Sequence, residues 1–268
     1  MAKRSRKTNS VTINRRIQEG RGQGHGKNYK PWLTIQDVPS RGLSHRIKGW
    51  KTGRVHHLFS NLERDYFYLL DWSEMVVDIR EQYPLLPLDE TEQIARQIGV
   101  RHPVDPSTRH PIIMTTDFVV DAQFSDQLRQ QARTVKQSAA LNKPRTLEKL
   151  EIERRYWQAR DVDWGIVTER EIPSPFTDNV RLLHGYQQIR DRIAPEMNIS
   201  EGIQMLLDNQ QAETIGDLAQ YSDEALNYPP GTALTILYHL LATHQLRVNM
   251  FLPLNHDVPL LSLSEVAS

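Results

Sequence analysis

Residues 112–124, IIMTTDFVVDAQF, and the tripeptide Thr134-Val135-Lys136 decide the fold that the sequence favours. The first stretch is rich in β-branched and aromatic residues, which favour a strand, and it contains the carboxylate of Asp117. The tripeptide predicts another strand, on which Thr134 and Lys136 lie on one face because side chains alternate along a strand. The two stretches together predict a sheet with charged groups among its apolar residues.

Regular elements are expected on both sides of these strands. The segment SNLERDYFYLLDW predicts a helix that Ser60 caps, with Glu63 at the capping-box position. The other expected elements are strands at 75–83 and 164–170, a helix at 146–160, and a region at 89–111 that is mostly loop with a short helical piece. The order helix, three strands, helix, strand predicts an α/β domain with a mixed central sheet.

A second, smaller domain is expected after Pro173 and Pro175. The sequence therefore predicts domains at 1–171 and 172–268. The second contains the helical segments VRLLHGYQQIRDRI, SEGIQMLLDNQ and TIGDLAQY, a helix at about 231–244, and then the strand-like runs LRVNMFLPL and VPLLSLSEV. Helices followed by a β-hairpin suggest a winged-helix-like module.

Charge is distributed unevenly along a chain whose net charge is zero. Residues 1–60 contain 14 Lys or Arg and 2 Asp or Glu, whereas residues 173–268 contain 4 and 11. A basic segment is typical of a surface that binds a polyanion, because each cation placed on a phosphate releases counterions. We therefore expect DNA contacts from a flexible basic arm at residues 1–30 and from the residues after it. A solvated tail is the alternative. The expected DNA-binding residues are Arg15, Arg16, Arg21, Lys27, Lys51 and Arg54.

The acidic C-terminal segment favours a different role. A winged-helix module often binds DNA, but a net negative charge opposes contact with phosphates. We therefore expect residues 172–268 to dock another protein.

The composition excludes several classes of protein. The chain has no cysteine, which excludes disulfides, thiolate zinc sites and cysteine nucleophiles. No apolar run approaches the roughly 20 residues of a membrane helix, so no membrane association is expected. No apolar stretch follows the basic start MAKRSRKTNS, so no secretory signal is expected either. These features suit a cytoplasmic protein.

Glu63, Asp117, Thr134 and Lys136 form the candidate catalytic constellation. Metal-assisted hydrolysis of a phosphodiester needs clustered carboxylates that hold hard divalent cations. A nearby lysine can neutralise developing charge. Nucleases of the restriction-endonuclease-like fold arrange an acid on a helix, an Asp on one strand and a lysine on the next. The expected metal ligands are Glu63, Asp117, Thr134 and the carbonyl of Val135.

Each of these residues also has a purely structural interpretation. Glu63 can serve the capping box alone, Asp117 can cap a turn, and Lys136 can protect an edge strand. Asp121 shares a strand face with Asp117 and is a lesser metal-binding candidate. The ten histidines show no H-E-x-x-H pattern and offer no competing site.

Several long blocks resemble the TnsA family, the endonuclease subunits of heteromeric, Tn-seven-type transposition systems. They cover most of residues 19–170 in the family's order: EGRGQGHGKNYKPWLT, HRIKGWKTGRVHHLFSNLE, DIREQYPLLP, TTDFVVD, TVKQSAAL and LEKLEIERRYW. The resemblance implies that Glu63, Asp117 and Lys136 are the catalytic acid, the metal-binding Asp and the catalytic Lys. It also implies Mg²⁺, for which Mn²⁺ substitutes, and action on bacterial nucleoid DNA.

The resemblance further implies a defined place in transposition. The family cuts the 5′ ends of a transposon while a TnsB-like transposase cuts and joins the 3′ ends, and a TnsC-like ATPase regulator is expected to bind the C-terminal domain. One departure stands out, because Thr134 occupies a position where the family commonly has Gln. Glu148 and Glu151 are expected to compensate, unless they form a solvated face paired with Arg155.

Three hypotheses follow from these observations. The first is a cut-and-paste endonuclease that acts with its partner proteins. The second, motivated by Thr134, is an assembly subunit that binds DNA and proteins without cutting. The third is a stand-alone restriction or repair nuclease, which would cut DNA without partners.

Overall fold

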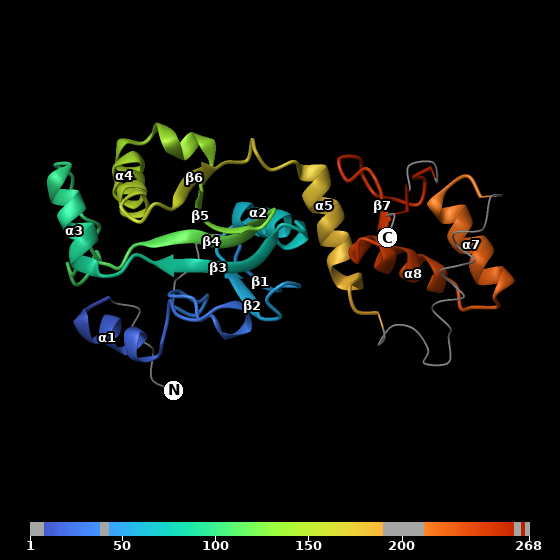
Figure 1. The fold of residues 1–268 in the computed structure, drawn as a ribbon, viewed down its shortest axis with the longest axis horizontal. Coiled ribbons are helices and arrows are strands. Elements are labelled where there is room, and N and C mark those ends of the chain that lie inside the picture. The colour runs from blue at the N-terminus through green and yellow to red at the C-terminus, as the bar shows by residue number, and fades with distance from the viewer. Residues whose placement is uncertain (1–7, 38–42, 190–211, 260–263, 266–268) are drawn as a thin grey trace. The chain divides into compact units, whose positions relative to one another are not determined.

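The computed structural model describes residues 8–37, 43–189, 212–259 and 264–265. The chain divides into two compact units, Met1–Ile172 and Pro173–Ser268. The residues between α1 and β6 belong to the first unit, and those from α5 onward to the second (Figure 1).

A four-stranded mixed sheet forms the centre of the first unit (Figure 1). Its strands lie in the order β3-β4-β5-β6; β3, β4 and β5 are antiparallel, and β6 is parallel to β5. Their bounds are Val76–Pro84 for β3, Thr115–Phe124 for β4, Gln127–Val135 for β5 and Asp163–Val167 for β6. The expected α/β class with a mixed central sheet is confirmed.

Helices cover both faces of this sheet. The first unit contains α2 (Asn61–Trp72), α3 (Leu88–Gln97), the short η2 (Ser138–Asn142) and α4 (Pro144–Gln158). Tyr66 of α2 packs edge-on against Phe118, with ring centroids 5.5 Å apart. Val119, the next residue of β4, points to the opposite face because side chains alternate, and there it joins the core under α4.

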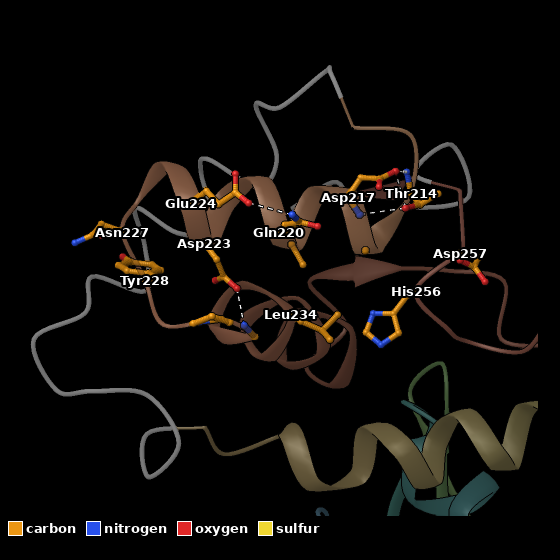
Figure 2. A pocket seen from close by; sticks show the side chains of 14 residues that line it. Thr214, Asp217, Gln220, Asp223, Glu224, Asn227, Tyr228, Leu234, His256 and Asp257 are labelled. Atoms are coloured by element: carbon orange, nitrogen blue, oxygen red, sulfur yellow. Dashed lines mark hydrogen bonds between the residues drawn. The ribbon is translucent and has the colours of Figure 1, made fainter.

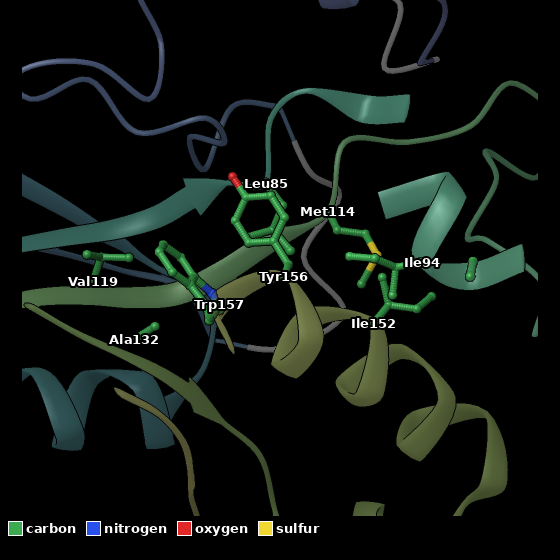
Figure 3. Close-up of a cluster of buried hydrophobic side chains, with 9 residues drawn as sticks. Leu85, Ile94, Met114, Val119, Ala132, Ile152, Tyr156 and Trp157 are labelled. Carbon is green, nitrogen blue, oxygen red and sulfur yellow. The ribbon is translucent and has the colours of Figure 1, made fainter. Parts of the chain in front are cut away.

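The core on the α4 face is a single apolar cluster (Figure 3). Val119 and Ala132 are paired across β4 and β5, and both are fully buried. Trp157 and Tyr156 of α4 contribute the largest side chains, and their rings meet edge-on. The cluster consists of Leu85, Ile94, Ala95, Met114, Val119, Ala132, Ile152, Tyr156 and Trp157. It fixes α3 and α4 relative to the strands that carry the candidate site.

A separate antiparallel hairpin precedes α2. Its strands are β1 (His45–Lys48) and β2 (Val55–Leu58). Arg54, at the turn, donates to the buried carboxylate of Glu81 on β3, as does the ring of His56 at 2.8 Å. Burial opposes ionisation of Glu81, but the His56 and Arg54 charges and hydrogen bonds hold its pKa well below the usual range. This ion pair ties the hairpin to the sheet.

The expected flexible arm at residues 1–30 is wrong for residues 8–30. Residues Ser10–Gln18 form helix α1, and Ile13 packs with Trp32 and Ile113. Gly22 has φ +81°, and a Cβ there would lie 2.2 Å from Pro84, so only glycine fits this contact. Residues 26–28 add the 3-10 helix η1 (Gly26–Asn28). The glycine-rich segment is thus folded against the first unit.

Helices dominate the second unit. They are α5 (Ser174–Leu183), the short η3 (His184–Tyr186), α7 (Ile215–Ala225) and α8 (Thr232–Ala242). Thr214 and Asp217 form a capping box at the start of α7. The helix expected for SEGIQMLLDNQ lies outside the described residues.

The expected hairpin of the second unit is described only in part, because residues 260–263 and 266 of VPLLSLSEV lie outside the described residues. The two strands that pair are β7 (Leu246–Arg247) and β8 (Ser264–Glu265). A strand through all of LRVNMFLPL is therefore wrong, because Asn249–Leu252 forms a turn. Side-chain bonds from Asn179 of α5 to the carbonyls of Met250 and Leu252 hold this turn.

Among the helices of the described residues, none is long and apolar enough to cross a bilayer.

Candidate active site

Glu63 lies in the first turn of α2, and it is only 8% exposed. Its Oε2 accepts a hydrogen bond from the backbone N of Phe59 at 2.9 Å, and its Oε1 accepts one from Ser60 Oγ at 3.1 Å. Ser60 Oγ in turn accepts from the backbone N of Glu63, also at 3.1 Å. The cap is therefore present, but the carboxylate is also turned toward the sheet, where Gln82 contacts it.

Asp117 and Lys136 form the centre of the cluster. Lys136 Nζ lies 2.8 Å from Asp117 Oδ2, and the same oxygen accepts from the backbone N of Val135 at 2.8 Å. The Val135 carbonyl, predicted as a metal ligand, accepts from Lys136 Nζ at 2.9 Å. Asp117 is 8% exposed, so this carboxylate is held by two donors inside the unit.

The charges of these groups act on one another. Burial, followed by the charge of Asp117, raises the pKa of Glu63 to about 7. Burial also works against the ammonium of Lys136, yet the charge and hydrogen bond of Asp117 raise its pKa above the ordinary value. Burial raises the pKa of Glu153, even though Thr134 and Thr116 donate to its carboxylate.

With its three carboxyl groups ionised, the cluster holds more negative than positive charge. Glu63, Asp117 and Glu153 are buried carboxylates, and Lys136 is the cation that acts on Glu63 and Glu153. Uncompensated buried carboxylates are unfavourable unless a cation joins them. Their oxygens are the hard ligands that Mg²⁺ prefers, so the donor set fits a divalent ion.

The hydroxyl of Thr134 is hydrogen-bonded to a buried carboxylate. Its Oγ1 donates a short hydrogen bond to Glu153 of α4, and Thr116 Oγ1 donates to the same oxygen at 2.7 Å. Glu153 is 4% exposed and was not among the predicted site residues. Its position could have been inferred, because it shares a helical stripe with Leu150 and Trp157 at i−3 and i+4.

The expected compensation by Glu148 and Glu151 is wrong. Glu148 pairs with Arg145 at 2.6 Å, and Glu151 pairs with Arg154 and Arg155 at 2.8 and 2.7 Å. These are ion pairs along the surface of α4. The structure thus brings together Glu63, Asp117, Thr134, Val135 and Lys136, adds Glu153 and Gln82, and leaves Glu148 and Glu151 outside.

Asp121, the lesser candidate, lies in a different cluster. Its carboxylate and that of Asp78 lie with the exposed ring of His25 in a group whose potential ligand atoms are within 4.8 Å. Arg80 already occupies this group, with its Nη2 2.5 Å from Asp121 Oδ1. A resident guanidinium supplies the positive charge there, so the two carboxylates are explained without a metal ion.

The predicted DNA-binding residues fall into two sets. Arg16 and Arg21 both pair with Asp37, at 3.5 and 2.6 Å, and Arg54 pairs with Glu81. Their side chains are 9%, 15% and 8% exposed and lie in ion pairs within the first unit, which argues against contact with DNA, and their role as phosphate contacts stays a prediction. The sequence did not indicate these ion pairs, because the partner carboxylates of Asp37 and Glu81 lie 16 or more residues away along the chain. Arg15 and Lys27 are exposed, and Lys51 is partly buried.

The second unit contains an acidic cavity of about 710 Å³ beside α7 (Figure 2). Among the described residues, its lining includes the carboxylates of Asp217, Asp223, Glu224 and Asp257 and no Lys or Arg. Asp223 caps α8 by accepting from the backbone N of Gly231 and of Ala233. Asp217 belongs to the capping box of α7. Glu224 and Asp257 are the acids of this cavity without such a capping role.

A mixed sheet that brings two carboxylates and a lysine together is typical of nucleases, and the comparisons with known proteins agree. The family described as "TnsA-like endonuclease N terminal" matches residues 73–169, and the one described as "TnsA endonuclease C terminal" matches residues 171–250. The protein is thus a DNA endonuclease.

A curated relative gives the particular family. The chain is 43% identical over 252 residues to "Transposon Tn7 transposition protein TnsA" of Escherichia coli, covering 94% of this chain and 90% of that protein. The chain belongs to the TnsA endonuclease family.

Proposed function

We propose that this chain cuts the 5′ ends of a transposon during cut-and-paste transposition, using Mg²⁺ held by Glu63 and Asp117. The single observation that carries the proposal is the convergence of Asp117 and Lys136, 2.8 Å apart, beside the buried carboxylate of Glu63. The transposition role is supported by the 43% identity to the transposition protein of Escherichia coli.

Each residue has a distinct role in hydrolysis. A bound Mg²⁺ supplies Lewis-acid polarisation of the phosphate and lowers the pKa of a coordinated water. Glu63 and Asp117 provide the carboxylate oxygens that hold the ion. Lys136, fixed by Asp117 and by the Val135 carbonyl, places a positive charge where the phosphate becomes more negative. Mn²⁺ is expected to substitute, because it accepts the same oxygen ligands.

The bond from Thr134 to Glu153 bears on the non-cutting alternative. Thr134 donates its hydroxyl to Glu153, so a third carboxylate stands at the position where a metal ligand was expected. Hard cations prefer carboxylates to neutral oxygens. Glu153 therefore supplies an oxygen ligand in place of the one that is lost because position 134 has no Gln. This favours a cutting subunit.

The test is the fate of the transposon ends with Asp117→Ala. In a reaction reconstituted with the partner transposase and ATPase, we expect 5′ cutting to cease while 3′ joining and assembly continue. Products should change from simple insertions to joined replicons. Unchanged 5′ cutting would falsify the assignment of Asp117. Cutting by the purified chain alone would favour a stand-alone nuclease.

For the second unit, we propose a winged-helix-like module that docks a TnsC-like ATPase at residues 172–268. A TnsB-like transposase is the other proposed protein partner, and transposon-end DNA is proposed to bind the first unit. The acidic cavity supports a partner segment rich in Lys or Arg, because opposite charges favour association. The complex is proposed to act on the bacterial nucleoid in the cytoplasm.

Charge reversal in the cavity tests this docking. Glu224→Lys and Asp257→Lys together should weaken ATPase binding at low salt by at least tenfold, measured by titration calorimetry. Asp178→Lys, an exposed acid of α5 paired with Arg181, is the matched control. Equal losses in both variants would count against the cavity as the docking site.

A further inference from the structure

Gln82 of β3 occupies an unusual backbone position beside the candidate active site. The strand pairs Glu81 with Phe118 and Tyr83 with Thr116, so Gln82 lies level with Asp117 across the ladder. Its φ of +50° is in the left-handed region, which residues other than Gly, Asn and Asp rarely adopt. The residue is 4% exposed. Strained positions of this kind persist where the surrounding structure holds them, and they concentrate at functional sites.

The backbone of Gln82 is held from two sides. Its carbonyl accepts from the backbone N of Trp32 at 3.1 Å, and Trp32 is 1% exposed in the folded N-terminal segment. The preceding Glu81 is fully buried and paired with Arg54 and His56. Because the backbone is fixed on both sides of Gln82, few side-chain conformations are accessible to this residue.

The amide of Gln82 bridges a helix and a strand. Its Nε2 lies 3.4 Å from Glu63 Oε2, and its Oε1 accepts from Thr115 Oγ1 at 3.4 Å. The other two donors to Glu63, from Phe59 and Ser60, belong to the start of its own helix. Gln82 is therefore the contact that relates the Glu63 carboxylate to the sheet on which Asp117 lies.

A neutral amide suits this task better than a cation. Arg80, two residues earlier on β3, neutralises Asp121 by a direct ion pair. An arginine beside Glu63 would likewise supply the positive charge that a divalent ion is needed to supply. An amide orients a carboxylate by hydrogen bonding while leaving its negative charge available.

We propose that Gln82 is a positioning residue that aims the Glu63 carboxylate at Asp117, so that the two acids bind one divalent ion. The inference rests on the proposed function, since it requires Glu63 and Asp117 to share an ion. Gln82 acts through Glu63 and touches no reacting atom. Its loss should weaken ion binding in the absence of DNA, a readout independent of cleavage.

The experiment is titration calorimetry of the full chain with Mn²⁺, without DNA, together with thermal melting. Gln82→Asn keeps an amide and tolerates the left-handed backbone, but it is one methylene too short to bridge. Gln82→Ala removes the amide. Both should bind Mn²⁺ about 10- to 100-fold more weakly, as expected when an orienting partner of a metal ligand is lost. The matched control is Gln123→Ala, whose amide bonds to the Ser125 carbonyl at the far end of β4.

The Asp117→Ala variant distinguishes failure of the proposed ion site from failure of the positioning role of Gln82. If Asp117→Ala loses Mn²⁺ binding while Gln82→Asn, melting like the wild type, binds as tightly as the wild type, the positioning role is overturned and the ion site stands. If Asp117→Ala binds Mn²⁺ like the wild type, the proposed ion site itself fails, and the role of Gln82 fails with it. Weakened binding in Gln82→Asn, with unchanged melting and an unaffected Gln123→Ala, supports the inference.

Discussion

Lys136 Nζ lies 2.8 Å from Asp117 Oδ2, the same oxygen that accepts from the backbone N of Val135. The ammonium is thus fixed by the carboxylate that is proposed to hold the ion. The side chain of Lys136 is 36% exposed, and under the proposed function its ammonium meets a phosphate that enters from solvent. The proposed function thus assigns both ion binding and charge stabilisation to this one residue pair.

Lys136→Met should abolish most cutting while leaving the fold intact. Removing a preorganised positive charge from the transition state reduces the rate by roughly 10²–10³-fold. The measurement is 5′-strand cleavage in the reconstituted reaction, with Lys143→Met, an exposed lysine just before α4, as the control. A Lys136→Met rate within threefold of wild type would remove the lysine from the mechanism.

Glu63→Gln should make the ion-free protein more stable at alkaline pH. The folded pKa of Glu63 is raised from 4.5 to about 7, so folding favours the protonated carboxyl. Stability is full below pH 4.5 and falls as the pH rises to 7, and the loss amounts to up to about 3 kcal/mol. Glutamine has no such loss.

Urea unfolding with a chelator at pH 5 and pH 8 measures this difference. The wild type should lose stability relative to Glu63→Gln between these two values. Adding Mn²⁺ at pH 8 should restore the wild type and have little effect on the variant, because ion binding stabilises the native state alone. Parallel pH dependence of the two proteins would show that Glu63 is not desolvated.

Thr134→Val should destabilise the first unit through Glu153. The valine has a similar shape but cannot donate to the buried carboxylate, which keeps the bond from Thr116. Loss of a hydrogen bond to a buried charged group costs about 1–3 kcal/mol. Thr134→Ser, which retains the hydroxyl, is the control in a chemical denaturation experiment. Equal stability of the valine and serine variants would contradict this role.

Local patterns were sufficient for the parts of the fold with strong periodicity. Ser60 caps α2 as expected, and the β-branched and aromatic residues around Asp117 predicted β4. Strand β5 begins at Gln127, earlier than predicted. The sequence did not indicate this start, because the first half of the strand is mostly polar and exposed and lacks an apolar alternation. Backbone pairing with β4 holds this half of β5 in the strand conformation that its composition alone does not favour.

Long-range contacts explain what the sequence did not predict. The N-terminal segment is polar and rich in glycine, which is typical of a flexible arm, yet Asp37 pairs with both Arg16 and Arg21, Glu19 also pairs with Arg21, and the segment folds. Glu153 was missed because a carboxylate is ordinarily expected on an exposed face, although its spacing from Leu150 and Trp157 indicates the buried one. The burial of a charge depends on partners that only the fold brings together.

The two kinds of arginine in the N-terminal segment should respond differently to substitution. Arg15→Gln with Lys27→Gln removes two exposed charges, so the slope of log affinity for DNA against log salt should flatten by about 2. Arg21→Gln should leave that slope unchanged and instead lower stability by about 1–3 kcal/mol, because Asp37 loses its closest partner. DNA binding by fluorescence anisotropy over a salt series, with thermal melting of each variant, measures both effects. A flattened slope for Arg21→Gln with unchanged melting would mean that Arg21 leaves Asp37 for a phosphate when DNA binds.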